Sequence, residues 1–257
     1  MAQQQNPGEA AALIAAFRDE MYLQRIDDDE LFRRFRFVRA DLGDLEIGER
    51  ERTFRLAQAS YYMARGFQAL DTVQEVLDQD DDLRRGKFKK LQKSYTRLDD
   101  IIALYEESMA LAEAYMAGGR DGRGVRLYTE SLSQLSTLKT LGFLMSNGPK
   151  IQPLAEEAVS LDPRDPKARI ILASRYVYSP AVWGGDPDRG IEMLEEVKAA
   201  GGLDKEDEHN LAVGIGFAHT MAGRWAEAAP YFREALAVYP GNVYAAAMLE
   251  LSEAGGP

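Results

Sequence analysis

The sequence predicts an all-helical fold in which antiparallel helix pairs stack side by side. Apolar residues recur at three- and four-residue spacing along most of the 257 residues, and sustained two-residue alternation is absent. Ala, Leu, Glu, Arg and Met are abundant, which favours helices over sheets. Glycine and proline separate the periodic segments into lengths of about 12 to 20 residues, as expected for stacked helix pairs.

Three helix starts are marked by a capping side chain followed directly by proline. They are Asn6-Pro7, Asp165-Pro166 and Asp186-Pro187. A side-chain oxygen accepts from free backbone N–H groups at such a start, and proline suits the first helical position. We expect joints between helices at Gly118-Gly119, Asn147-Gly148-Pro149, Gly184-Gly185, Gly201-Gly202, Gly223 and Pro240-Gly241.

Residues 1–104 are expected to form an N-terminal helical region that caps the stack. Within them, residues 28–42 form an amphipathic helix with Leu31, Phe35 and Val38 on one face and several arginines elsewhere. The arginines also suit a membrane surface, but we expect packing against the next helix pair. A degenerate repeat in this region is indicated by Ala59, Tyr62 and Gly66.

Residues 209–242 form the best-defined repeat, because 242 − 209 + 1 gives the 34 residues of a tetratricopeptide (TPR) unit. Small residues stand where the two helices of such a unit pack closely, an aromatic residue stands at the turn, and a proline closes the unit. The segment resembles the TPR family in this pattern, although His219 and Ala212 stand where Tyr and Trp are usual. The matching residues are Gly216, Gly223, Trp225, Ala228, Phe232, Ala235 and Pro240.

Degenerate copies of this pattern make residues 105–257 a TPR-like repeat region. The copy before the best one has about five extra residues in its turn, at 180–184, including Trp183. The turns Gly184-Gly185-Asp186 and Tyr239-Pro240-Gly241-Asn242 are similar to those of bacterial repeat proteins of unknown role. The resemblance implies a right-handed α-solenoid, a superhelix whose first helices line a concave groove.

The charge of the chain argues against nucleic acid as a partner. The formal net charge is −11, so the average surface repels phosphate backbones. A basic stretch at 84–90 follows an acidic run at 78–82, and we interpret both as solvated charges, although the basic stretch also suits an acidic partner. No apolar run of about 18 residues is present, so we expect no membrane span.

The opening residues Met1 to Gln5 are polar and lack an apolar secretory core. They resemble the start of a mature exported chain whose signal was replaced by Met. The chain has no cysteine, which does not decide the compartment. We expect a periplasmic rather than a cytoplasmic location.

No constellation in the sequence predicts catalysis. His209 and His219 are ten residues apart, which is no metal-ligand spacing on one helix. The glycine-rich stretch 118–124 lacks the Lys-Ser/Thr ending of a phosphate loop, so we interpret it as a turn between helices. We therefore expect no catalytic residue, no cofactor and no metal, in a chain that is not an enzyme.

The TPR register assigns groove positions that mix apolar and polar residues. Such a groove suits an extended or helical peptide better than a uniformly acidic tail. Lys167, Asn210 and Val213 fall in the same register. The expected partner-binding residues are Met109, Glu113, Met116, Ile170, Ser174, Tyr178, Trp183, Phe217, Thr220 and Met221.

Two functions are compatible with these features. The first is a non-catalytic scaffold that binds a protein or peptide partner in the groove, and an oligomer is compatible with it. The second is a helical accessory protein of an extracytoplasmic transporter with a small-molecule pocket. Trp183 either plugs a gap between helix pairs or borders the groove as an apolar anchor.

Overall fold

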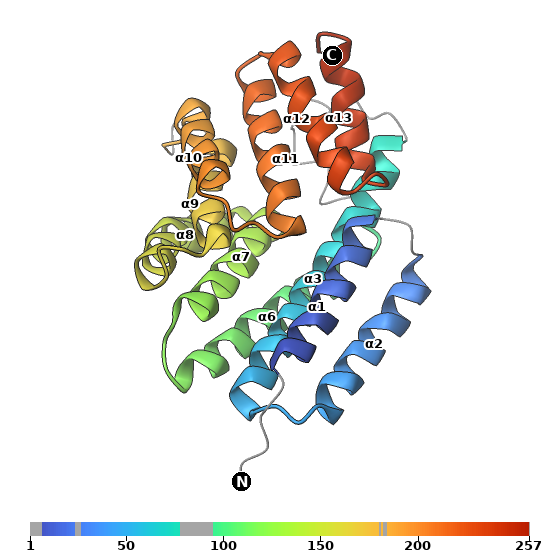
Figure 1. Cartoon of the computed structure of the whole chain (residues 1–257), viewed down its shortest axis with the longest axis vertical. Helices are drawn as coiled ribbons and strands as arrows, with labels where there is room; N and C mark the ends of the chain where they lie inside the picture. Colours follow the sequence, from blue (N-terminus) through green and yellow to red (C-terminus); the bar gives the residue numbers. More distant parts are fainter. Residues whose placement is uncertain (1–6, 24–26, 78–94, 180, 182–183, 257) are drawn as a thin grey trace.

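The fold comes from a computed structural model, which describes residues 7–23, 27–77, 95–179, 181 and 184–256, without the side chains of 70–77. Regular structure in this part of the chain is helical, which confirms the predicted fold class (Figure 1). The helices are α1 (Pro7–Leu23), α2 (Asp28–Asp44), α3 (Glu49–Leu77), α6 (Leu98–Ala117), α7 (Gly122–Leu138), α8 (Leu141–Leu161), α9 (Pro166–Tyr178), α10 (Pro187–Ala200), α11 (Lys205–Met221), α12 (Trp225–Val238) and α13 (Val243–Glu253).

The helices form a TPR-like stack of helix pairs. Consecutive helices pack against one another from α6 to α13. Helices two apart in the chain also touch, for example α9 with α11 and α1 with α3. Such contacts to the next helix and the next but one are typical of helical repeats. The boundary expected at residues 104/105 falls within α6.

Helices α9 and α11 are the first helices of their repeats, and we call them the inner helices. They run parallel in a fixed register. Near their starts, Lys167 Nζ lies 2.8 Å from Glu206 Oε2. Near their ends, the rings of Tyr178 and Phe217 stack with centroids 5.0 Å apart. Both pairs are 39 residues apart (206 − 167 and 217 − 178), which is a 34-residue repeat plus the five residues of the insertion at 180–184.

The α11–α12 pair packs as the repeat pattern predicts. A Cβ on Gly216 would lie 3.0–3.2 Å from atoms of the Phe232 ring, so the two helices approach closely here. Ala228 and Ala235 are fully buried in the same contact. Gly223, at the turn, has φ +73°, a conformation that favours glycine.

The predicted helix starts are confirmed for the two that lie in the described residues. Asp165 Oδ1 accepts from the backbone N–H of Lys167 at 2.9 Å, where α9 begins. Asp186 Oδ1 accepts from the N–H of Arg189 at 3.1 Å, where α10 begins. Asn6 lies outside the described residues, and α1 begins at Pro7.

Helix α2 covers the end of the stack. Leu31, Phe35, Val38 and Leu42 are buried, and the helix packs on α3 and α1. Helices α1 and α3 therefore cover most of the apolar face of α2.

The joint expected at Asn147-Gly148-Pro149 is wrong, because α8 is continuous through these residues. Proline removes one helical N–H bond, which leaves a carbonyl without its usual partner. Here none of residues 141–150 is buried, so water can solvate that carbonyl. Asn147 Nδ2 also donates to the Phe143 carbonyl at 3.1 Å.

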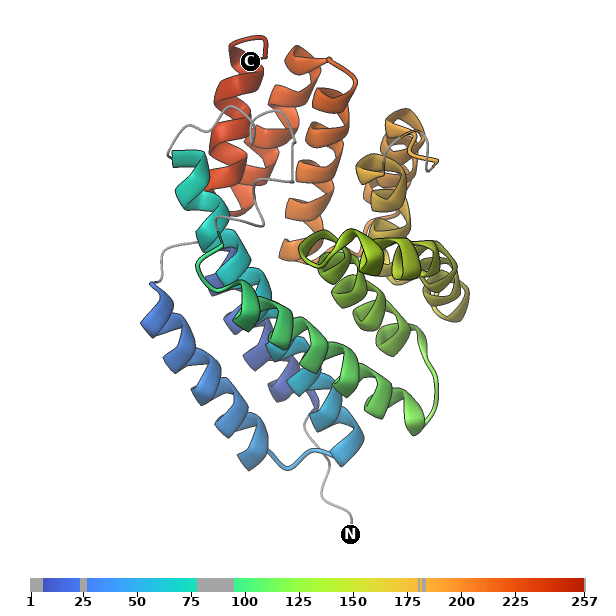
Figure 2. The same ribbon diagram turned by 180° about the vertical axis from the view of Figure 1, so that it is seen from behind.

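The two ends of the stack meet. The ring of Tyr22 on α1 stacks on Tyr239, with centroids 5.0 Å apart, and the Tyr239 hydroxyl donates to Asp19 Oδ1 at 2.8 Å. Helix α13 packs on α3 on the same side of the molecule (Figure 2). The first helices therefore contact the last repeat.

Enlarging a small residue in the α11–α12 contact should destabilise the protein. We expect Ala228→Leu and Ala235→Leu each to lower the free energy of unfolding by about 1–3 kcal/mol, because the added methyl groups force packed helices apart. Urea denaturation measures the effect. The control Ala246→Leu, at an exposed position of α13, should change little; equal midpoints for all three variants would contradict the packing.

Candidate functional site

A cluster of charges joins the starts of α9 and α11 to α1. We call Arg18, Lys167, Asp204, Glu206 and Asp207 the central ion cluster. Lys167 Nζ lies 3.1 Å from Asp204 Oδ1, 2.8 Å from Glu206 Oε2 and 2.6 Å from Asp207 Oδ1. One ammonium group thus holds three carboxylates at the beginning of the next inner helix.

Helix capping places these charges. Asp204 is the N-cap of α11, and its side chain accepts from the N–H of Asp207 while the Asp207 side chain accepts from the N–H of Asp204, both at 3.0 Å. Such a reciprocal cap satisfies two backbone donors. The cap of α9 at Asp165 puts Lys167 in the first turn of the preceding inner helix. The acids of one helix start therefore face the lysine of the other.

Within the central ion cluster, Glu206 is the carboxylate that is contacted by side chains from the largest number of helices. Its side chain is only 6% exposed. Arg18 Nη1, from α1, lies 3.5 Å from Glu206 Oε2 and 2.7 Å from Asp204 Oδ2. The hydroxyl of Tyr62, from α3, donates to Glu206 Oε2 at 2.8 Å, and that of Tyr22 donates to Oε1 at 3.0 Å. Side chains of α1, α3 and α9 therefore meet at one residue of α11.

The central ion cluster is charged at neutral pH. Burial disfavours the charge of Glu206, but Lys167 and Arg18 hold its pKa below the usual value. Burial likewise opposes the charge of Lys167, yet the carboxylates of Glu206, Asp207 and Asp204 raise its pKa. Because these opposite charges stabilise one another, the cluster holds the starts of α9 and α11 against α1.

A second buried ion group lies on α7. Arg126 Nη1 is 3.0 Å from Glu130 Oε1, and Arg126 Nε is 3.0 Å from Asp165 Oδ2, the cap of α9. Burial raises the pKa of Glu130 to about 7, although Arg126 acts against this change. Glu130 therefore changes its charge near neutral pH.

Beyond the central ion cluster, apolar side chains are exposed on α9 and α11. We call Tyr178, Phe217 and Met221 the inner aromatic face. Phe217 is buried, whereas Tyr178 is 48% and Met221 56% exposed. Burial nevertheless raises the pKa of Tyr178 to about 12, with Arg65 acting against it. The Tyr178 ring stacks on buried Phe217, so protein covers part of the ring while the rest faces solvent.

The other expected groove residues are spread over different environments. Ile170 and Thr220 are buried, and Ser174 is half-buried. Met109 and Met116 pack partly against the N-terminal core, while Glu113 is exposed. Trp183 lies outside the described residues, as do the acidic and basic runs at 78–82 and 84–90.

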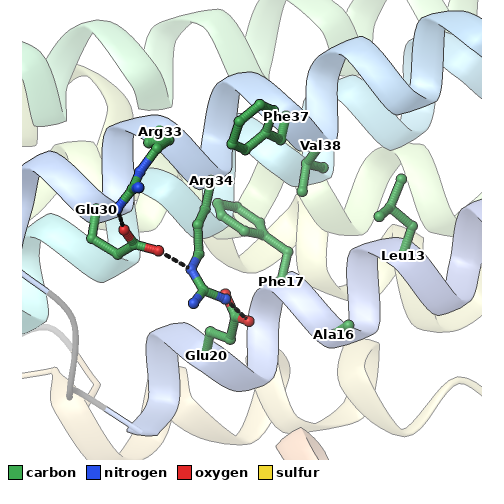
Figure 3. Close-up of a pocket in the computed structure, with 9 residues that line it drawn as sticks. All are labelled: Leu13, Ala16, Phe17, Glu20, Glu30, Arg33, Arg34, Phe37 and Val38. Atoms are coloured by element: carbon green, nitrogen blue, oxygen red, sulfur yellow. Dashed lines mark hydrogen bonds and ion pairs between the residues drawn. The ribbon is translucent and has the colours of Figure 1, made fainter.

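Two open clefts lie elsewhere. The first, of about 480 Å³, lies between α6, α7 and α8 and contains Glu113 and Met116 from the expected groove. The second, of about 350 Å³, lies between α1 and α2 (Figure 3). Figure 3 shows an apolar floor of Phe17 and Val38, with Arg34 bound to Glu20 and Glu30 at one end. Because Arg34 is paired within the chain, its charge is already compensated.

The described part of the chain holds neither a metal-ligand group nor a membrane span. Within it, His, Asp and Glu side chains form no group of three that could hold a metal ion. None of its helices is long and apolar enough to cross a membrane.

Sequence reasoning missed the central ion cluster. The repeat register named Lys167 and Asn210 as groove positions, but Arg18 is 186 residues from its partner Asp204. Local spacing carries no information on such a contact. The three-residue spacing of Asp204 and Asp207 was the available signal, and alone it indicates only a helix start.

No protein-family model and no curated protein sequence matches this chain. Among solved structures, the chain is similar to the crystal structure of a thermophilic TPR protein from Thermus thermophilus. The two share 17% sequence identity with a TM-score of 0.48, over 79% of this chain and 100% of that chain.

Removing the ammonium group at the centre of the cluster should be costly. We expect Lys167→Met to lower the free energy of unfolding by about 3–5 kcal/mol, because buried carboxylates lose their main counter-charge. Lys198→Met removes a lysine from an exposed ion pair with Glu234 and should cost less than about 1 kcal/mol. Urea denaturation at pH 7 measures the free energy of unfolding of both variants. Equally small losses in the two would show that Lys167 stabilises the protein no more than a lysine in an exposed ion pair does.

Glu130 should make stability depend on pH. Its pKa is about 7 in the folded protein and about 4.3 in an unfolded chain. The stability contributed by its bound proton is therefore complete below about pH 4 and is lost as the pH rises through 7. We expect Glu130→Gln to remove most of the loss in unfolding free energy between pH 5 and 8, roughly 3 kcal/mol. An unchanged pH slope of the urea midpoint in this variant would contradict the assignment.

Proposed function

We propose that the chain is a non-catalytic helical-repeat scaffold that binds a protein or peptide partner through the inner aromatic face. The observation that carries this proposal is the exposure of Tyr178 (48%) and Met221 (56%) beside buried Phe217. Apolar side chains that gather on a surface favour contact with apolar groups of a partner. Aromatic residues are also enriched among the residues that dominate binding energy.

The rigidity of the two helices supports this proposal. The central ion cluster holds α9 and α11 at their starts, and the Tyr178–Phe217 stack holds them near their ends. A preorganised surface loses little conformational entropy when a partner binds. Most of the contact energy is then available for affinity.

We expect the partner segment to present an apolar side chain to Tyr178 and Met221. The alternative, a transporter accessory protein with a small-molecule pocket, depends on the loop that contains Trp183, and no observation on the described residues favours it.

Site-specific cross-linking tests this function. We expect a photoreactive amino acid at Met221 to form an adduct with a protein of the native host. The same group at Phe37, which is 62% exposed on α2, should form none, because this control shares the exposure but not the surface. Adducts at Phe37 and none at Met221 would refute the proposal.

The affinity for the cross-linked partner gives a second measurement. Tyr178→Ala should weaken binding more than tenfold, because an aromatic anchor is removed. The urea midpoint should stay nearly unchanged, since the side chain is half exposed. Binding at full affinity would show that the partner contacts another surface.

A further inference from the structure

The amino half of α8 is an exposed apolar segment. None of residues 141–154 is buried, and the first buried side chains of the helix are Ala155 and Ala158. Leu141 is 68% and Met145 58% exposed. These two residues continue at four-residue spacing into Pro149 and Pro153, which places all four along one side of the helix. We call Leu141, Met145, Pro149 and Pro153 the α8 ridge.

The α8 ridge runs directly into the 480 Å³ cleft between α6, α7 and α8. Pro149 and Pro153 belong to the lining of the cleft, together with apolar residues of the facing helices such as Met116 and Val125. A convex apolar ridge and a concave apolar cleft therefore lie next to each other on one face. Neither is covered by the described part of the chain.

Two charges of opposite sign line this cleft without a counter-charge. Lys150, on α8, contacts Asn147 Oδ1 at 2.9 Å, and Glu113, on α6, accepts from the Tyr128 hydroxyl. Among the described side chains, no oppositely charged group lies within 4.0 Å of either. Arg120, by contrast, already pairs with Glu157. The cleft thus offers a cation and an anion on facing helices for contacts outside the chain.

We propose that this face binds a second copy of the chain in a two-fold symmetric dimer. In such a contact the same surface is used twice, so it must carry both halves of every interaction. This face does so, because it has a ridge and a cleft, and a cation and an anion. Leu141 and Met145 of each copy pack into the cleft of the other, and Lys150 of each copy pairs with Glu113 of the other.

The distribution of charge favours this face over the rest of the surface. Two copies with a net charge of −11 repel each other at most orientations. Residues 136–154, however, contain Lys139 and Lys150 and no acidic residue. Lys139 already pairs with Glu106, and this segment brings no unpaired carboxylate of its own to the contact between copies.

The mass in solution tests the dimer. Light scattering coupled to size-exclusion chromatography should give a mass near 2 × 28.6 = 57.2 kDa for the wild-type chain. Met145→Glu should give 28.6 kDa with an unchanged circular dichroism spectrum, because the new carboxylate would lose its water where the ridge packs against apolar residues such as Met116 and Val125. Phe37→Glu alters an equally exposed apolar residue on α2 and should stay dimeric. A monomeric wild-type chain at every soluble concentration, or a dimeric Met145→Glu variant, overturns the proposal.

The two charges allow a sharper test of two-fold pairing. Lys150→Glu and Glu113→Lys should each be monomeric alone, because like charges then meet across the contact. When mixed, the two variants should form a heterodimer, since both contacts again join opposite charges. The doubly exchanged chain should dimerise by itself for the same reason. Lys198→Glu, with the same change in net charge as Lys150→Glu, should stay dimeric.

The Lys198→Glu control separates a specific pairing of Lys150 with Glu113 from a general effect of net charge. Failure of the mixed variants to associate, while the wild-type chain dimerises, would overturn the two-fold pairing. Cross-linking at Met221 is measured on another surface, so either proposal can fail without the other.

Discussion

The buried carboxylate of Glu206 is the constraint on which the arrangement of the inner helices depends. A charge removed from water must be compensated, and here the compensation comes from Lys167 on α9, Arg18 on α1 and Tyr62 on α3. Apolar contacts tolerate small shifts between helices, whereas these contacts hold only at short, directed distances. We interpret the central ion cluster as the element that sets the relative positions of four helices, while apolar packing supplies most of the burial.

The two proposed binding surfaces, the inner aromatic face and the α8 ridge, differ in how firmly the rest of the protein holds them. The inner aromatic face is built from two helices that the ion cluster aligns, so its shape is set before a partner arrives. The α8 ridge lies on a helix whose fully buried residues, Ala155 and Ala158, stand in its carboxyl half. Tyr178 and Met221 lie on α9 and α11 and belong to neither the α8 ridge nor the lining of the cleft beside it.

The sequence predicted the features that depend on neighbouring residues. The spacing of Gly216 and Ala228 identified the closely packed α11–α12 pair, and Asp165 identified the start of α9. The joint at Pro149 was mispredicted, because exposure of the helix decides whether proline is tolerated. For the candidate site, the family register named Tyr178, Phe217 and Met221 as groove positions; they lie on the neighbouring helices α9 and α11, and their role in binding stays a prediction. The contact from Arg18 to Asp204, 186 residues apart, left no local pattern.

The meeting of α1 with the last repeat changes how this repeat protein can fold. An open solenoid has mainly contacts between neighbouring repeats, so its units can form or fray almost independently. Here the stacking of Tyr22 on Tyr239 and the bond from Tyr239 to Asp19, 220 residues apart, connect the ends. Such long-range contacts raise the contact order, which slows folding. They also tie the terminal helices to the rest, so that unfolding from one end must disrupt the other, and the chain gains the cooperativity of a single globular domain.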